Sequence, residues 1–285
     1  MNSASYDNYS LKNFNTYGIG GVAKKVVLPK TIDDFIKLLS DLESKQENYY
    51  ILGNGSNVIL PDANFDGTIV ITKNINKYQI EDDTVILETG IMLPFINQEL
   101  QKLGYSNFVW ASGIPGTIGG SIKGNAGAYG HEMAECLISI LVYNNGKVKE
   151  IPREDIEFTY RNSNIPGIIL SAKYKLIKYT EQEIEEISNK TKNRFLTQPI
   201  GTKNAGSVFR NPSKELSAGK IIDDLGLKGH HVGDAMVSEK HANFIVNNGN
   251  ATSDDIISLI KEIKQKVKDN YNIDLILEQK IVKWD

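Results

Sequence analysis

The 285-residue sequence has little of several features that mark particular classes of protein. It contains one cysteine, Cys136, which excludes an internal disulfide framework and a cysteine-cluster metal site. With 32 basic and 35 acidic residues, it shows no excess of positive charge that would indicate a nucleic-acid or anionic-membrane partner. No apolar run approaches the ~18 residues of a membrane span, and residues 1–14 lack the basic and apolar regions of a signal peptide. We therefore expect a cytoplasmic protein.

Common motifs for phosphate and metal binding are also absent from the sequence. No G-x-x-x-x-G-K-S/T is present, so the chain is not a P-loop protein. Residues 18–21, Gly-Ile-Gly-Gly, differ from a Rossmann G-x-G-x-x-G and precede a predicted strand rather than a helix. The histidines show no metal-ligand spacing such as H-x-x-x-H. We expect no metal site, and His131, His230 and His231 are predicted to be structural or at the surface.

At ~150 residues per domain, the length indicates about two domains and leaves room for three small ones. The predicted elements include both helices and strands. Apolar periodicity and capping residues predict the elements. Strands are predicted over residues 22–28, 49–52, 68–72, 85–89, 137–144, 147–151, 168–177 and 273–282, of which the three between 137 and 177 form a meander. Helices are predicted over residues 31–44, 93–103, 181–193 and 252–271. The polar helix over 181–193 marks a domain boundary.

What the sequence does have is clustered glycine, with 24 glycines against 8 prolines. Residues 53–57, Gly-Asn-Gly-Ser-Asn, follow a predicted strand, and seven of the 18 residues in 113–130 are glycine. Each interior glycine costs a helix or strand ~0.5–1 kcal/mol, so we predict that residues 113–130 form loops around one short helix. Bare backbone N–H groups can converge on an anion. Two such segments predict a dinucleotide site, and ordinary turns without a ligand are the alternative.

Glycines and some of their neighbours in these two segments are the predicted cofactor contacts. They are Gly53, Asn54, Gly55, Ser56, Asn57, Gly113, Pro115, Gly116, Gly119, Gly120, Asn125, Ala126, Gly127 and Gly130.

A set of short motifs, in one order from about residue 10 to residue 282, resembles a single family. They lie at residues 15–23 (NTYGIGGVA), 52–57 (LGNGSN), 113–120 (GIPGTIGG), 124–130 (GNAGAYG), 160–163 (YRNS), 198–199 (QP), 205–212 (AGSVFRNP), 226–229 (GLKG) and 237–247 (VSEKHANFIVN). Together they resemble UDP-N-acetylenolpyruvoylglucosamine reductase, also called UDP-N-acetylmuramate dehydrogenase, in a shorter branch of that family.

The resemblance implies an α+β fold with three parts. An FAD-binding domain of the vanillyl-alcohol-oxidase (PCMH) type would occupy residues 15–180, in two α+β lobes divided near residue 70. Residues 181–194 would form a linking helix, and residues 195–285 a smaller α+β substrate domain.

The resemblance also implies the reaction. NADPH would reduce the enolpyruvyl ether of UDP-N-acetylglucosamine to UDP-N-acetylmuramate by way of FAD, in peptidoglycan precursor synthesis. The partners would be these small molecules, and we expect a monomer. Because no histidine precedes His131, non-covalent FAD is expected; related FAD oxidases of alcohols or sugars, many of which attach FAD to an early histidine, are an alternative. Trp110 is predicted to lie in the core rather than stack on the flavin, and Cys136 to be buried and inert.

Three residues match the family's catalytic positions. Arg161 would face the substrate carboxylate, on which hydride addition builds negative charge. Ser207 would donate the proton, and Glu278 would act at the carboxylate end of the substrate. Without the resemblance, a structural salt bridge for Arg161 and a turn hydrogen bond for Ser207 are the simpler interpretations. A binding protein without catalysis is a further alternative, and the retention of all three residues argues against it.

The chain departs from the family pattern at two places. The pattern reads L-E-x-E-V near the C-terminus, where this chain has Leu275-Ile-Leu-Glu-Gln279. Asp274 is therefore the alternative acid if Glu278 has no role. Asn211 and His241 are the predicted substrate contacts, and Arg210 stands where lysine is common in the family.

Overall fold

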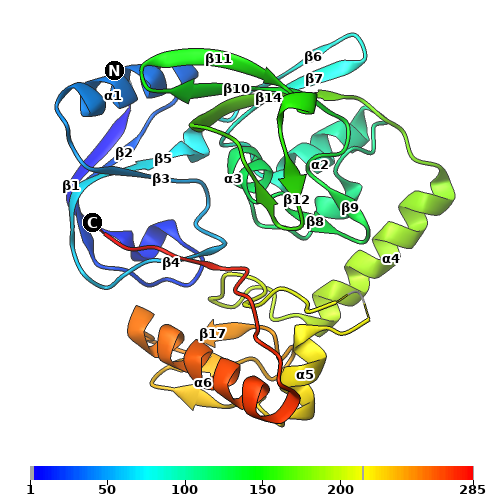
Figure 1. The fold of residues 1–285 in the computed structure, drawn as a ribbon. Coiled ribbons are helices and arrows are strands. Elements are labelled where there is room, and N and C mark those ends of the chain that lie inside the picture. Colours follow the sequence, from blue (N-terminus) through cyan, green and yellow to red (C-terminus); the bar gives the residue numbers. More distant parts are fainter. Residues whose placement is uncertain (1–2, 214, 285) are drawn as a thin grey trace. The chain divides into compact units, whose positions relative to one another are not determined.

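The structure is a computed structural model that describes residues 3–213 and 215–284 (Figure 1). Its internal contacts divide the chain into two units. The first unit comprises Met1–Tyr6, Lys25–Asn54 and Gly67–Arg194, and the second comprises Asp7–Lys24, Gly55–Asp66 and Phe195–Asp285. Each unit therefore combines segments that are distant in the sequence.

An antiparallel five-stranded sheet in the order β11-β10-β14-β7-β6 is the centre of the first unit (Figure 1). Its strands are β6 (Tyr78–Glu81), β7 (Thr84–Glu88), β10 (Leu137–Asn144), β11 (Lys147–Pro152) and β14 (Ile168–Lys175). The predicted meander is wrong, because β10 lies between β11 and β14. Lys147, Lys149 and Glu150 of β11 are exposed, and charged side chains of this kind suit an edge strand.

Helices pack against both faces of this sheet. Ile140 and Val142 of β10 belong to one core cluster with α2 (Leu93–Lys102) and α3 (Ile118–Lys123). Leu141 and Tyr143 pack with α1 (Ile32–Ser44) in another cluster. Because both faces are buried, the apolar run along β10 is nearly continuous instead of alternating.

A smaller sheet has the order β1-β2-β5-β3, with β3 and β5 parallel. Its strands are β1 (Ala4–Ser10), β2 (Val22–Leu28), β3 (Tyr49–Leu52) and β5 (Phe65–Ile71). The predictions for residues 22–28 and 49–52 are confirmed. Strand β5 starts earlier than the predicted residue 68 and ends where a 3-10 turn, η2 (Thr72–Asn74), begins.

Side-chain caps explain why the helix starts were predictable. The Thr31 hydroxyl accepts a hydrogen bond from the backbone N–H of Asp34 at 3.1 Å at the start of α1. Helix α6 (Ser253–Tyr271) starts with a capping box between Thr252 and Asp255. Helix α4 (Glu181–Thr197) begins as predicted and continues beyond residue 193.

The segment 113–130 forms loops around the short helix α3, as predicted, and then a hairpin of β8 (Gly127–Ala128) and β9 (His131–Glu132). A second hairpin joins β12 (Phe158–Thr159) to β13 (Asn162–Ser163). Trp110, in the 3-10 turn η3 (Val109–Ala111), is 2% exposed in the core, so its predicted burial is confirmed. The remaining 3-10 turns are η1 (Leu11–Phe14) and η4 (Arg153–Asp155).

In the second unit, α6 packs on a three-stranded sheet. The sheet has the order β15 (His231–Val232), β16 (Ala235–Val237), β17 (Ile245–Asn247). The apolar stripe of α6 contributes Ile256, Ile260, Ile263 and Val267 to one core cluster, to which α5 (Ala218–Asp224) adds Ile221 and Ile222. Among the described helices, none is long and apolar enough to cross a membrane.

The predicted strand over residues 273–282 is wrong as one continuous element. Leu277 forms a single antiparallel bridge with Phe209. After Glu278 and Gln279 the chain leaves that partner, and β18 (Lys280–Ile281) pairs in parallel with β4 (Val58–Ile59). The change of partner interrupts the strand, although the alternation of buried Leu275 with exposed neighbours follows the predicted pattern.

Candidate active site

Gly53 and Asn54, the first two residues of the first glycine-rich segment, contact the second segment within the first unit. The Asn54 side-chain amide donates to the Pro115 carbonyl at 2.8 Å. Gly53 lies so close to the Thr117 hydroxyl that a Cβ at residue 53 would overlap it. The start of the first segment is thereby attached to the loop that precedes α3.

Some glycines of the second segment are required by packing, and others leave space. A Cβ at Gly119 would overlap the Thr89 hydroxyl, and Gly116 is packed in a similar way. Gly120 is exposed, and Gly130, at φ +94°, has nothing within 4 Å of the position its Cβ would take. Bare, accessible backbone beside a second glycine segment is what a diphosphate needs for close approach. These residues therefore fit FAD.

Arg161 stands at the tip of the β12–β13 hairpin, next to the pair Thr159↔Asn162. Its φ of +58° lies in the left-handed region, which costs a residue with a side chain ~1–2 kcal/mol. Glycine or asparagine is favoured where a turn needs such a φ. Backbone strain of this kind is found at functional sites, and Arg161 shares it with eight other non-glycine residues of the described ranges.

Carbonyl groups of the second glycine segment hold the Arg161 guanidinium. Its Nη2 donates to the Gly127 carbonyl at 2.6 Å and its Nη1 to the Asn125 carbonyl at 3.5 Å. Its Cζ lies 4.9 Å from the centre of the Tyr160 ring. A Cβ at Gly127 would lie 2.9 Å from the Arg161 Nη1, so glycine permits this approach. Two predicted cofactor contacts thus bind the predicted catalytic arginine.

Asn125 also supports this hairpin through its side chain. The residue is fully buried, its Nδ2 donates to the Thr159 carbonyl at 3.0 Å, and its Oδ1 accepts from the Ala134 N–H at 3.3 Å. Because Thr159 precedes the turn, Asn125 helps to place Arg161.

Ser207 lies in the second unit, and hydrogen bonds hold the two residues that follow it. It is half-buried and follows Gly206, whose φ is +75°. The Val208 N–H donates to the Asn243 carbonyl at 2.9 Å. The Asn243 side chain accepts from the Phe209 N–H at 3.0 Å and donates to the Phe209 carbonyl at 2.8 Å. Asn243 therefore fixes the two residues that follow Ser207.

Glu278 is half-buried and lies beside this same segment. Its N–H donates to the Val208 carbonyl at 2.9 Å. The Asn57 side chain, a predicted cofactor contact, donates to the Glu278 carbonyl at 3.2 Å. The structure thus brings the segments of Ser207 and Glu278 together, whereas Arg161 belongs to the first unit.

The alternative acid and the predicted substrate contacts have clear structural partners. The Asp274 carboxylate forms an exposed ion pair with Lys268 at 2.8 Å. The Asn211 Oδ1 accepts from the Ala218 N–H at 3.2 Å, at the start of α5. The His241 Nδ1 accepts from the Asn243 N–H at 3.2 Å. Substrate binding by Asn211 and His241 stays a prediction.

Sequence reasoning missed three residues that support the Ser207 segment, namely Asn243, Gln279 and Tyr17. Asn243 and Tyr17 stand inside quoted motifs, and Gln279 is the position at which the C-terminal pattern departs. None of the three carries a signal for its contacts, because their partners are distant in the sequence.

Residues expected to be structural have polar or packing partners. His131 Nδ1 lies 2.9 Å from the Glu135 carboxylate, and His230 Nε2 lies 2.7 Å from that of Glu262. Cys136 is half-buried rather than fully buried, at φ +56°. Burial raises the pKa of its thiol, which fits the predicted lack of reactivity. In the described ranges, no three His, Cys, Asp or Glu side chains gather in a way that could hold a metal ion.

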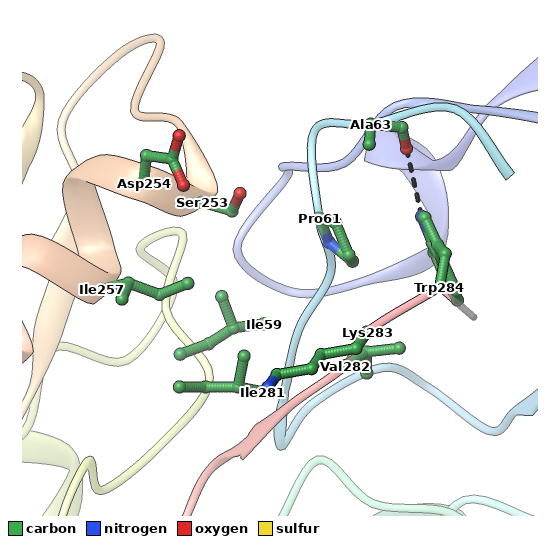
Figure 2. A pocket seen from close by; sticks show the side chains of 10 residues that line it. All are labelled: Ile59, Pro61, Ala63, Ser253, Asp254, Ile257, Ile281, Val282, Lys283 and Trp284. Carbon is green, nitrogen blue, oxygen red and sulfur yellow. Dashed lines mark hydrogen bonds between the residues drawn. The ribbon is translucent and has the colours of Figure 1, made fainter.

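A pocket of about 380 Å³ lies elsewhere in the second unit (Figure 2). The Trp284 Nε1 at one side of it donates to the Ala63 carbonyl at 3.0 Å. Its lining consists of Ile59, Pro61, Ala63, Ser253, Asp254, Ile257, Ile281, Val282, Lys283 and Trp284. Since no predicted site residue lines it, this pocket is separate from the candidate active site.

Comparison with known proteins identifies the family. Residues 23–151 match the model of an FAD binding domain, and residues 198–282 match that of the UDP-N-acetylenolpyruvoylglucosamine reductase C-terminal domain. The UDP-N-acetylenolpyruvoylglucosamine reductase of Petrotoga mobilis is 39% identical, over 97% of this chain and 94% of that protein. The chain belongs to the UDP-N-acetylenolpyruvoylglucosamine reductase family.

Other members of this reductase family agree with that assignment. The reductase of Alkaliphilus oremlandii is 40% identical, over 95% of this chain and 91% of its own length. The crystal structure of the reductase from Thermus caldophilus matches with a TM-score of 0.82 at 31% identity, over 100% of both chains. The predicted family and the α+β fold with an FAD-binding domain are confirmed.

Proposed function

We propose that the chain reduces the enolpyruvyl ether of UDP-N-acetylglucosamine to UDP-N-acetylmuramate, with NADPH as the hydride donor, in peptidoglycan precursor synthesis. FAD, when bound, supplies the hydride transfer that amino-acid side chains cannot perform. Family membership and the FAD-binding domain support this function. The hydrogen bond from the Glu278 N–H to the Val208 carbonyl supports the choice of residues, because it holds Glu278 beside the segment of Ser207.

The FAD-holding residues are half-buried residues of the first segment and exposed glycines of the second. Gly53 and Asn54 contribute from the first segment, and Gly120 and Gly130 from the second. Their bare backbone lets a diphosphate approach closely. Gly127 and Asn125, also predicted as cofactor contacts, serve to hold Arg161 as well.

Arg161 binds the carboxylate of the enolpyruvyl group. Addition of hydride to the terminal carbon moves negative charge onto that carboxylate, and a guanidinium donates two parallel N–H bonds to it. A donor that is already oriented stabilises this charge without reorganisation. The contacts with Gly127 and Tyr160 supply that orientation.

Ser207 delivers the proton to the carbon next to the carboxylate, and Glu278 acts at the same end of the substrate. A serine hydroxyl is a weak acid, so it can act only beside a developing carbanion in a site that excludes water. A carboxyl group near the substrate carboxylate is favourable if it is protonated and donates a hydrogen bond.

The domain ranges, the oligomeric state and the location in the cell are also part of this proposal. Residues 15–180 bind FAD, residues 181–194 link, and residues 195–285 bind the nucleotide sugar. The enzyme acts as a monomer in the cytoplasm, where NADPH is available.

The function is tested by the spectrum of the purified chain and by its product. We expect a yellow protein whose flavin stays in the supernatant after precipitation with trichloroacetic acid, because no histidine precedes His131. NADPH should bleach the flavin absorbance, and the enolpyruvyl ether should restore it. In D2O, the lactyl ether should carry one solvent deuterium on the carbon next to the carboxylate, measured by NMR.

A colourless protein that takes up no added FAD would contradict the proposal. Flavin that remains in the acid pellet would instead contradict non-covalent binding.

The role of Glu278 is tested by comparing Glu278→Gln with Glu278→Ala. If Glu278 is a neutral hydrogen-bond donor, the glutamine keeps one donor. Glu278→Gln should then slow re-oxidation by the substrate by ~10-fold or less, and Glu278→Ala should slow it more. Equal losses would mean that Glu278 carries charge or moves a proton. Stopped-flow absorbance measures each rate. Asp274→Ala is the matched control, and a Glu278→Ala enzyme with full turnover would remove Glu278 from the site.

A further inference from the structure

The Gln279 side chain connects three distant parts of the second unit. It is 3% exposed, and its amide nitrogen donates to the Ala205 carbonyl at 3.1 Å and to the Gly206 carbonyl at 3.0 Å. Its amide oxygen accepts from the Tyr17 hydroxyl at 3.0 Å. The two carbonyls belong to the residues that directly precede Ser207.

The chemistry of the partners determines the orientation of the Gln279 amide. Backbone carbonyls only accept hydrogen bonds, so the NH2 group must face Ala205 and Gly206. Burial raises the pKa of the Tyr17 phenol far above its ordinary value, and the hydrogen bond with Gln279 offsets only part of that increase. The phenol is therefore protonated at neutral pH and donates to the amide oxygen. Both polar atoms of the Gln279 amide therefore form hydrogen bonds.

Tyr17 is itself held in place, which makes the arrangement rigid. Its side chain is 0% exposed, and its carbonyl accepts from the Asn247 side chain at 2.9 Å. The Tyr17 hydroxyl is thus a fixed donor, and a fixed donor restricts the Gln279 side chain to one orientation. A buried network in which each group is satisfied rigidifies its surroundings.

The network acts on the N-terminal side of Ser207, which the hydrogen bonds of Asn243 do not reach. There the Asn204 side chain accepts from the Gly206 N–H at 2.9 Å, and the Gln279 amide binds the carbonyls of Ala205 and Gly206. Asn243 fixes Val208 and Phe209 on the C-terminal side. Gly206 has φ +75°, and no atom of the described residues lies within 4 Å of the position its Cβ would take, so packing there does not restrain it. Asn204 restrains the Gly206 N–H, and the Gln279 amide restrains the two carbonyls through its hydrogen bonds.

We propose that Gln279, oriented by Tyr17, is a positioning residue that holds the Ser207 hydroxyl in register for proton delivery. This proposal rests on the function proposed above for Ser207. It also accounts for the departure of the C-terminal motif: valine, the usual residue of the pattern at this position, has no donor for the two carbonyls. In this chain Gln279 supplies the donors, and it is hydrogen-bonded to Tyr17, which lies 262 positions away in the sequence.

The test measures the two half-reactions of Gln279→Met, which keeps the length of the side chain and removes its donors. We expect bleaching by NADPH to be unchanged and re-oxidation by the enolpyruvyl ether to slow by ~10- to 100-fold, as for a small misplacement of a reacting group. Tyr17→Phe removes only the donor to the amide, so it should slow re-oxidation by ~3- to 10-fold. If Gln279→Met does not fold, the Tyr17→Phe result decides.

A double variant separates positioning from a general structural effect. When Ser207 is already alanine, Gln279→Met should slow re-oxidation by no more than about twofold further, the scatter of independent effects. A merely structural role would add its full factor. Tyr143→Phe is the matched control, because the buried Tyr143 hydroxyl also donates one hydrogen bond, to Glu43 at 2.7 Å, in the first unit. It should leave both half-reactions unchanged.

The outcomes distinguish the two levels of the proposal. If Ser207→Ala alone leaves re-oxidation at the normal rate, the proposed role of Ser207 fails. If Ser207→Ala slows it and the Gln279 and Tyr17 variants do not, or if they slow bleaching equally, positioning by Gln279 is overturned.

Discussion

Replacing Ser207 with alanine is expected to leave NADPH oxidation intact and to slow re-oxidation by the enolpyruvyl ether by ~10²–10⁴-fold, the usual contribution of a positioned general acid. The first half-reaction needs no proton on a substrate carbon, whereas the second cannot finish without one. The measurement is stopped-flow absorbance of the bound flavin, with each substrate added separately.

Ser238→Ala is the control for this variant. Ser238 is also in the second unit, and its hydroxyl accepts from the Lys240 N–H at 3.2 Å, as a turn serine does. It should have no selective effect on re-oxidation. If Ser207→Ala behaves in the same way, or slows both half-reactions equally, Ser207 is a structural turn residue and not the proton donor.

Local signals were sufficient to predict much of the fold. The start of α6 depends on Thr252 and Asp255, which are close in the sequence and carry the capping signal themselves. Strand β10 was predictable because its apolar run is buried on both faces of the sheet. The glycine density of residues 113–130 likewise indicated loops around a short helix without any knowledge of their partners.

Long-range pairing is what the sequence could not reveal. The strand predicted over residues 273–282 is interrupted at Glu278 and Gln279, because the pairing partner changes there. Before this point the chain pairs with Phe209, and after it the chain pairs with strand β4. Periodicity predicts which face a side chain takes, but it contains no information on which strand will pair. The same limit hid the hydrogen bond between Tyr17 and Gln279.

Individual residues of the candidate site could be predicted only where they lie in a motif that resembles the family. Arg161 and Ser207 were identified from their motifs, yet their supports were not. Nothing in the residue types of Asn125 and Gly127 indicates that their carbonyls hold a guanidinium, because every residue has a carbonyl. Glycine density indicated a phosphate site, and at Gly127 part of its physical reason is room for Arg161.

Arg161→Lys is expected to slow re-oxidation by the substrate by ~10²–10³-fold, which corresponds to the ~2.7–4 kcal/mol typical of a lost preorganised stabilising group. Lysine keeps the charge but loses the planar pair of donors that matches a carboxylate, and it cannot make the same contacts with Gly127 and Asn125. Bleaching by NADPH, measured by stopped-flow absorbance, should change little. Arg153→Lys is the matched control, because Arg153 also donates to a backbone carbonyl, that of Ile156 at 2.9 Å, and lies over an aromatic ring in the first unit. If Arg161→Lys and Arg153→Lys lose the same small amount of activity, Arg161 only stabilises its hairpin. The left-handed backbone conformation of Arg161 would then need a different explanation.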